Sequence, residues 1–174
     1  MSETILRPAT PSDAEALAAL HVAVWRETYR HLAPSEAYAA LDESHRLAQW
    51  RAALAAPPPV QTFVLETGGE VLGLVSVGAP GQAAFGDAGE LRHLYLAPAL
   101  RGRKYGRLLL HAGLCALHEA GFAKAALAVV EENHAARAFY ARAGGCEGAR
   151  FIDQGPLWRS HNLVVHFELP PKRA

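Results

Sequence analysis

The chain has 174 residues, with 17 basic and 17 acidic side chains, so its formal net charge is zero at neutral pH. Proteins that bind the nucleic-acid backbone carry a basic excess, so this balance argues against nucleic acid as the main partner. No apolar run approaches the roughly 20 residues needed to cross a bilayer, and the N-terminus shows no signal-peptide pattern. We therefore expect a cytoplasmic protein without a membrane partner, folded as a single domain over residues 1–174.

In chain order, the first half predicts a strand, two helices and a pair of strands. Prolines stop the first strand, Ser12 or Asp13 can cap the next helix, and three consecutive prolines end the second helix. Gly68-Gly69 between two β-rich runs is a strong hairpin signal. The expected ranges are 4–9, 13–32, 42–56, 60–67 and 70–77.

The second half predicts a strand, a helix, a strand, a helix and two strands, after a Gly-rich loop over 78–89. Glycines follow both helices, as is common where a helix ends. The expected ranges are 90–97, about 104–120, 124–130, 134–143, 147–152 and 161–169. This order predicts an α/β protein with a mixed sheet and helices on its faces.

The cysteines and histidines point to no disulfide or metal. Cys115 and Cys146 are not closely spaced, and Cys115 falls within an apolar run, so we expect reduced, buried thiols. His111 and His118 are seven residues apart, which does not match the i, i+4 spacing of paired metal ligands. We expect no bound metal.

The segment RGRKYGR, from Arg101 to Arg107, lies between a predicted strand and a predicted helix. Helix N-termini leave backbone N–H groups unsatisfied and carry partial positive charge, so they bind anions. Gly102 and Gly106 allow close backbone approach, and the basic side chains add charge. The segment is neither a GxxxxGK[ST] nor a GxGxxG loop. By itself it fits a phosphate-binding turn and a solvated, basic helix start equally well.

Together with its neighbours, this turn resembles the GNAT superfamily of N-acetyltransferases. The family signature is a strand ending in L/V-x-V-x-P, followed by Q/R-x-x-G-x-G/A at the start of a helix. Leu94 to Pro98 match the strand, and Arg101 and Gly106 match the turn. A later family motif matches Asn133, Phe139 and Tyr140. The resemblance implies a GNAT-like fold, in which a mostly antiparallel sheet has splayed central strands and helices on both faces.

Two positions depart from the family pattern. Lys104 stands in place of the central Gly of the signature, and Gly145 stands where a bulky apolar residue is common. We expect Lys104 to hold ordinary helical angles in the first turn of its helix, which would make a non-glycine residue tolerable. We expect Gly145 to affect the packing of the last strands.

The resemblance also implies a reaction, the transfer of acetyl from acetyl-CoA directly to a primary amine. Backbone groups of Leu94, Tyr95 and Leu96 would pair with the pantetheine arm. Asn133 would contact the cofactor, cap its own helix, or do both. The pyrophosphate would be held by the turn, which consists of Arg101, Gly102, Arg103, Lys104, Tyr105, Gly106 and Arg107.

Tyr140 is the candidate general acid, since a phenol can protonate the thiolate that leaves; the alternative is a half-buried structural aromatic. Glu90 is the candidate general base, and a solvated strand-end carboxylate is an equal alternative. Rivals for the base are Asp87, His93, Glu131 and Glu132. Trp25 and Tyr29, one helical turn apart, can form the wall of an acceptor pocket or part of the core.

The acceptor itself, a small molecule or a peptide with an amine, is not indicated by the sequence. The alternative function is an acyl-CoA-binding regulatory or interaction domain that lacks catalysis. Exposed sheet edges in such an architecture can support a homodimer.

Overall fold

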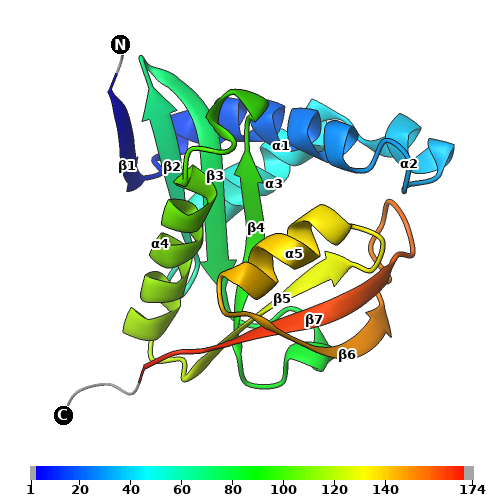
Figure 1. Ribbon diagram of the computed structural model, residues 1–174. Coiled ribbons are helices and arrows are strands. Elements are labelled where there is room, and N and C mark those ends of the chain that lie inside the picture. Colours follow the sequence, from blue (N-terminus) through cyan, green and yellow to red (C-terminus); the bar gives the residue numbers. More distant parts are fainter. Residues whose placement is uncertain (1–2, 171–174) are drawn as a thin grey trace.

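The computed structural model describes residues 3–170, in which seven strands form one mixed sheet in the order β1-β2-β3-β4-β5-β7-β6 (Figure 1). Neighbouring strands are antiparallel except β4 and β5, which are parallel. The elements are β1 (Thr4–Pro8), α1 (Ala14–Thr28), α2 (Ser35–Ala40), α3 (Glu43–Ala55), β2 (Gln61–Thr67), β3 (Glu70–Gly78), β4 (Gly89–Leu96), α4 (Tyr105–Glu119), β5 (Lys124–Val130), α5 (His134–Arg142), β6 (Cys146–Ile152) and β7 (His161–Glu168). The predicted mixed sheet is confirmed.

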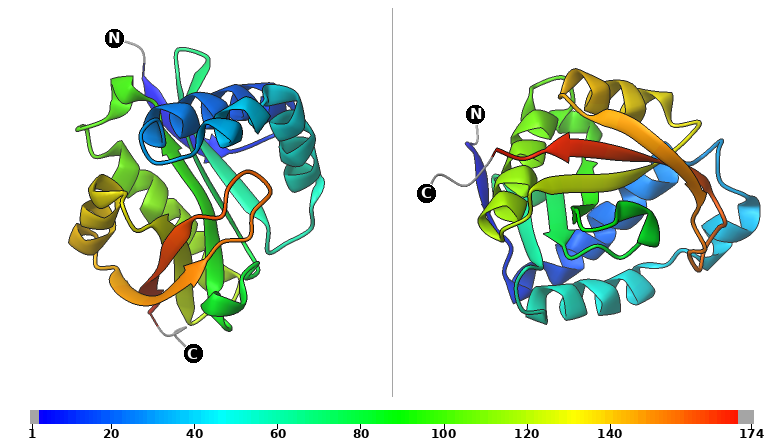
Figure 2. Two further views of the ribbon diagram at one scale, coloured as in Figure 1. Left: turned by 90° about the vertical axis from the view of Figure 1, so that its right-hand side faces the viewer. Right: turned by 90° about the horizontal axis from the view of Figure 1, so that it is seen from below.

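Helices cover both faces of the sheet, with α4 and α5 on one face and α1 and α3 on the other (Figures 1 and 2). The alternation of side chains along β3 explains this layering, because successive residues of a strand point to opposite faces. Val75 and Val77 pack with α4, whereas Leu74 packs with α1 and α3. Gly113 of α4 lies so close to β3 that a Cβ there would come within 2.9 Å of Val75. The sheet therefore separates two apolar cores.

The two central strands separate along their length. β4 and β5 pair at Gly89–Ala125 and Glu90–Ala126, and at no further position in the described part of the chain. Just beyond, a β-bulge leaves Arg92 without a partner on β3, and bulges bend a strand and increase its twist. The rest of β4 therefore presents an unpaired edge toward β5, and this confirms the predicted splay.

Along the unpaired edge, every second residue of β4 directs its backbone N–H and C=O groups toward the gap. The amide of Ala97 donates a hydrogen bond to the Leu72 carbonyl across the β3 ladder, at 2.8 Å. In an antiparallel pair the backbone groups of alternate residues point to the same side. The groups of Tyr95 therefore face β3, and those of Leu94 and Leu96 face the gap.

Most expected elements are confirmed, and the chain differs from expectation after α1. Helix α1 ends at Thr28 and not near residue 32, and the chain then forms α2, which is too short to give a clear periodic signal. The expected burial of both thiols was wrong, because Cys115 is half-buried and Cys146 is exposed on the edge strand β6. No helix within residues 3–170 is long and apolar enough to cross a membrane.

Candidate active site

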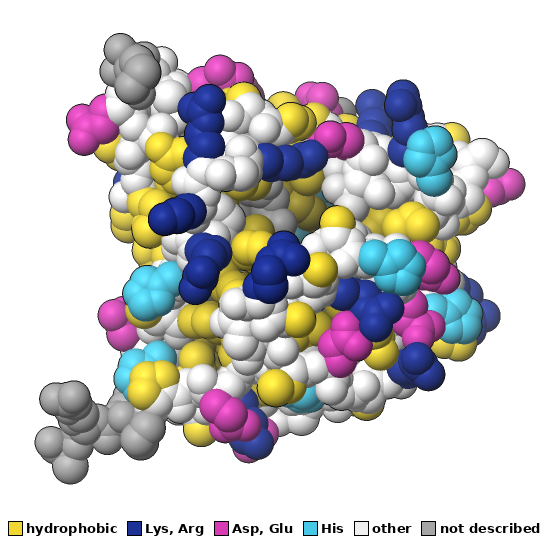
Figure 3. Space-filling view, in the orientation of Figure 1, with side chains coloured by type: hydrophobic (Ala, Val, Ile, Leu, Met, Phe, Trp, Pro, Cys, Tyr) yellow, Lys and Arg dark blue, Asp and Glu magenta, His cyan; other side chains and the backbone are white. Residues whose placement is uncertain are grey.

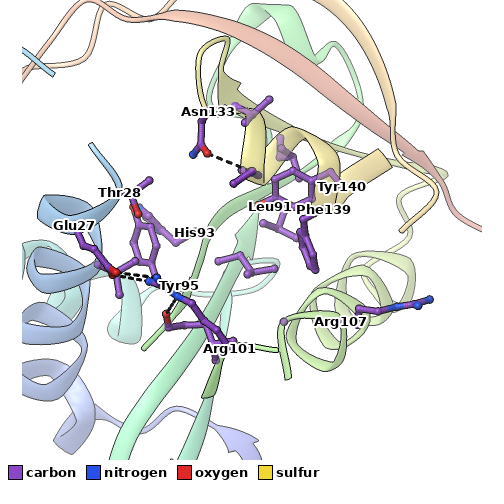
Figure 4. A pocket seen from close by; sticks show the side chains of 18 of the residues that line it. Glu27, Thr28, Leu91, His93, Tyr95, Arg101, Arg107, Asn133, Phe139 and Tyr140 are labelled. Atoms are coloured by element: carbon purple, nitrogen blue, oxygen red, sulfur yellow. Dashed lines mark hydrogen bonds and ion pairs between the residues drawn. The ribbon is translucent and has the colours of Figure 1, made fainter. Parts of the chain in front are cut away.

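A cavity of about 720 Å³ lies where β4 and β5 separate (Figure 4). The edges of the two strands form its base, α1 forms one wall, and α5 with the start of α4 forms the other. Its lining residues are Val24, Glu27, Thr28, Tyr29, Leu91, Arg92, His93, Leu94, Tyr95, Leu96, Arg101, Gly102, Lys104, Gly106, Arg107, Leu127, Ala128, Val129, Asn133, Ala135, Ala136, Phe139, Tyr140 and Arg142.

The N-terminus of α4 opens on this cavity without a side-chain cap. The amide of Leu108 is the first to bond back into the helix, to the Lys104 carbonyl. In residues 3–170 no side chain caps the preceding amides of Tyr105, Gly106 and Arg107. Unsatisfied helix amides form an anion-binding site. The arrangement suits a phosphate group.

Lys104 does not hold helical angles, so that expectation was wrong. Its φ is 67° and its ψ is 0°, which makes it the one non-glycine residue with positive φ in the described chain. Gly102, two residues earlier, also has a positive φ of 74°. The left-handed conformation costs an L-residue about 1–2 kcal/mol. The glycine of the family signature therefore corresponds to a position with left-handed backbone angles, and in this chain a lysine adopts those angles.

Basic side chains gather around the hollow between α4 and α5 (Figure 3). Within residues 3–170, Lys104 and Arg107 form no ion pair, so both charges are available to an anion. Two residues of the predicted turn lie outside the lining: Arg103 is exposed to solvent, and Tyr105 packs on the core. The structure thus brings together the other five: Arg101, Gly102, Lys104, Gly106 and Arg107.

Asn133 acts as the N-cap of α5 and also lines the cavity. Its side-chain oxygen accepts a hydrogen bond from the Ala136 amide at 3.2 Å. Asn133 therefore caps its own helix, which is one of the two roles expected for it. Because Asn133 also lines the cavity, it is placed where it could contact a cofactor as well. Tyr95 also lines the cavity, with its hydroxyl 3.5 Å from His21 Nε2.

Tyr140 is half-buried on the α5 wall beside Phe139 (Figure 4). Its ring also packs against Phe167. Burial, and secondarily the proximity of Tyr29, raises the pKa of the Tyr140 phenol. The phenol therefore keeps its proton throughout the physiological pH range and can donate it.

Two aromatic residues, Trp25 and Tyr29, were expected near the acceptor. Tyr29 lines the cavity, and Trp25 does not. Burial raises the pKa of Tyr29, an effect that the Asn133 side chain partly opposes. Trp25 is 7% exposed and packs against Tyr29 and Tyr38 behind the wall. Trp25 is therefore part of the core and not of the cavity wall.

Glu90 lies at the closed end of the splay and is not among the lining residues. Its Oε2 accepts a hydrogen bond from the Gly81 amide at 2.8 Å and lies 3.6 Å from Arg92 Nε. Burial raises the pKa of this carboxyl group, although the Gly81 amide and Arg92 oppose the shift. For Glu90 to act as the base, the proton would have to travel from the cavity to this carboxylate, which lies outside the cavity lining.

His93, a rival candidate for the base, does line the cavity. Burial and the charges of Arg46 and Arg92 lower the pKa of its imidazole to about 4, so the ring is neutral at pH 7. Its Nδ1 is buried without a hydrogen-bond partner, beside the ring of His21 at 5.0 Å between centroids. No group of three or more potential metal ligands occurs among the described residues.

Several lining residues escaped the sequence analysis. Glu27 and Thr28 of α1 carry no local motif, and Glu27 meets Arg101 from 74 positions away in the chain. Ala135, Ala136 and Arg142 could have been found, because they share a helix with Asn133 and Tyr140.

A family model described as the acetyltransferase (GNAT) family matches residues 23–145, which is more than half of the chain. A search of curated protein sequences gives no match. Many solved structures are similar. A GCN5-related N-acetyltransferase from Rhodopseudomonas palustris has 23% identity and a TM-score of 0.75, with 97% of this chain and 98% of that chain covered.

Two further solved structures contain a coenzyme. yncA from Salmonella typhimurium, with its cofactor acetyl-CoA, has 22% identity and a TM-score of 0.73, covering 99% of this chain and 98% of its own. The PaiA N-acetyltransferase from Thermoplasma acidophilum, in complex with coenzyme A, has 15% identity and a TM-score of 0.71, covering 95% and 99%. These likenesses concern the fold. Because the family model spans both the turn and the Asn133–Tyr140 helix, the chain belongs to the GNAT family of acetyltransferases.

Proposed function

We propose that this chain, as a single catalytic domain, transfers acetyl from acetyl-CoA to a primary amine. The observation that supports this most is the uncapped, basic N-terminus of α4, which opens on a cavity beside the unpaired edge of β4. Acetyl-CoA supplies an acetyl group activated as a thioester, together with phosphates that such a helix terminus suits. The match to the acetyltransferase family supports an enzyme over a catalytically inactive binding domain.

The cavity residues divide into two tasks. Amides from Gly102 to Arg107, with the charges of Lys104 and Arg107, would hold the pyrophosphate. The backbone groups of Leu94 and the amide of Leu96 face the gap, so they would pair with the pantetheine arm, while the Leu96 carbonyl accepts a bond from Arg101. Asn133 would stay at the N-cap of α5 and contact the arm from the opposite wall.

Direct transfer forms a bond between the acceptor nitrogen and the acetyl carbon and breaks the carbon–sulfur bond. The nitrogen loses a proton, and the departing sulfur gains one. Tyr140 would donate the proton to sulfur, because burial keeps its phenol protonated. Glu90 would accept the amine proton through water, since its carboxylate lies outside the lining. His93 is the rival acceptor of that proton, because it lines the cavity with a neutral ring.

The charges of the cavity favour an acceptor with one amino group over a polyamine. Glu27 is the one acidic residue among the described lining residues, and both of its oxygens bind Arg101. No lining carboxylate is then left to hold a second ammonium group. The acceptor would be a small molecule or a peptide with an amine. The proposed homodimer through the exposed sheet edges, β1 and β6, stays a prediction.

The test combines binding with turnover. Calorimetry should show acetyl-CoA binding, and thiol release should appear with some members of a panel of monoamines and polyamines. Tyr140→Phe should lower kcat at least about tenfold with acetyl-CoA affinity unchanged, which is about 1.4 kcal/mol in the barrier. Tyr38→Phe is the control, since the Tyr38 hydroxyl bonds the Arg26 carbonyl away from the cavity.

Three results would each contradict part of the proposal. Tight binding without turnover on any amine would favour the inactive binding domain. Absence of acetyl-CoA binding would point to a different phosphorylated ligand. Equal loss of turnover in Tyr140→Phe and Tyr38→Phe would remove the specific role of Tyr140.

A further inference from the structure

We infer that Glu27 is a positioning residue, which holds Arg101 and thereby orients the cofactor-binding turn from the opposite wall of the cavity. This inference rests on the proposed function. Glu27 belongs to α1, the wall on the acceptor side, and Arg101 begins the turn that leads into α4 (Figure 4). The pair thus connects the two walls of one cavity.

The geometry of the pair is bidentate. Arg101 Nη1 donates to Glu27 Oε1 at 2.9 Å, and Arg101 Nη2 donates to Glu27 Oε2 at 2.7 Å. A planar guanidinium held by two parallel bonds has a defined orientation, unlike a lysine at the same place. Arg101 Nε donates a third bond to the Leu96 carbonyl at 3.2 Å. All three nitrogens of the guanidinium are therefore engaged.

The third bond joins the pair to the strand that would bind the pantetheine arm. The Leu96 carbonyl is one of the β4 groups that face the gap and have no partner on β5. Because Arg101 donates a hydrogen bond to this carbonyl, its guanidinium lies where the open edge of β4 meets the turn. The family signature alone places Arg101 among phosphate ligands, whereas the observed bonds make it a brace for both cofactor-binding segments.

The turn needs such a brace because its backbone is held in an unfavourable conformation. Gly102 has a φ of 74° and Lys104 a φ of 67°, and the residue at 104 is not a glycine. Strained residues persist where the surrounding structure determines them. Among the described residues, Arg101 is the one residue of this turn whose side chain forms hydrogen bonds or an ion pair with another element.

The pair should matter more to binding than to stability. The side chains of Arg101 and Glu27 are 44% and 48% exposed, and exposed ion pairs contribute about 0–1 kcal/mol to folding. Loss of Glu27 should therefore shift the melting temperature by only a few degrees. It should leave the guanidinium unrestrained and weaken the affinity for acetyl-CoA.

The test measures acetyl-CoA binding by calorimetry and the melting temperature of the free protein. Glu27→Gln and Arg101→Gln should each weaken acetyl-CoA binding about tenfold, or about 1.4 kcal/mol. The double variant should be no weaker than either single one, because both remove the same interaction. The charge-exchanged variant, Glu27→Arg with Arg101→Glu, should recover part of the affinity. Glu36→Gln, an exposed acid on α2, is the matched control and should bind normally.

The outcomes separate this inference from the proposed function. Unchanged acetyl-CoA affinity in Glu27→Gln would overturn the positioning role and leave the function intact. Tighter binding would also overturn it, by showing that Glu27 competes with phosphate for Arg101. Additive losses in the double variant would assign the two residues independent roles. Failure of the wild-type chain to bind acetyl-CoA would instead overturn the proposed function, and this role with it.

Discussion

Two helix N-termini open on the same cavity, and they are built in opposite ways. At the start of α5, the side chain of Asn133 accepts the Ala136 amide, so the helix supplies its own cap. At the start of α4, Lys104 stands at the N-cap position with no capping hydrogen bond and a left-handed backbone. The first terminus has a side-chain cap of its own, and the second has uncapped amides and unpaired cations in the described residues.

The two helices also differ in how they are held. Helix α4 buries Leu109, Leu110 and Leu117 against the sheet, whereas α5 has no fully buried residue within its described length. A helix anchored by its apolar face can tolerate an uncapped end, since packing supplies most helix stability in proteins. Helix α5 packs on the core only through partly buried residues, among them Ala136, Phe139 and Tyr140, so it depends more on its caps. The proposed anion-binding terminus therefore belongs to the helix that is packed more deeply against the sheet.

Giving α4 a cap should have the largest effect. Lys104→Asp places a carboxylate where it can accept the free amides, and it replaces a positive charge by a negative one beside the phosphate site. We expect acetyl-CoA affinity to fall about hundredfold, or about 2.7 kcal/mol, with no loss of melting temperature. Calorimetry and thermal unfolding check this. Normal affinity would show that the amides of α4 do not hold the ligand.

A change at the other end of α5 tests how that helix is held. A Cβ at Gly145 would lie 2.7 Å from Val165 and 2.8 Å from Phe167. Gly145→Ala should therefore destabilise the chain by about 1–3 kcal/mol, as measured by urea unfolding. Gly144→Ala is the control, because a Cβ there meets open space and its cost comes from the positive φ of 95°. An unaltered stability in Gly145→Ala would contradict close packing at this end.

Removing the cap of α5 should cost less. Asn133→Ala should lower the free energy of unfolding by about 1 kcal/mol, and Asn133→Asp should not, because Asp also caps helices. Chemical denaturation measures both variants. If Asn133→Ala leaves stability unchanged but weakens acetyl-CoA binding, the residue acts through the cofactor and not as a cap.

The smallest expected effect is a gain. Lys104→Gly relieves the left-handed strain, so the free energy of unfolding should rise by about 0.5–1 kcal/mol. Acetyl-CoA affinity should stay within about a few-fold, because we expect the amides to do most of the holding. Lys104→Ala removes the same charge but keeps the strain, and it should not gain stability. A hundredfold loss of affinity in both variants would make the lysine side chain the main phosphate ligand.

Much of the fold and part of the site could be predicted from local patterns. The hairpin at Gly68-Gly69, both of whose φ angles are positive, and the Asn133 cap depend on residues close in sequence. The position of Tyr140 in the cavity followed from a family motif. The location of Glu90 outside the lining could not be predicted, because it depends on where β4 and β5 stop pairing.

The residue pattern was enough to predict the order of most elements, their approximate ends and a basic, glycine-containing turn between β4 and α4. These properties arise from periodicity, glycine and proline positions, and charges on neighbouring residues, which act over short distances. Three features became visible only in the folded chain: the left-handed backbone of Lys104, the bulge at Arg92 and the pairing of Glu27 with Arg101. Each of these depends on contacts between distant segments, because a strand edge or a wall exists only after the chain has folded around it.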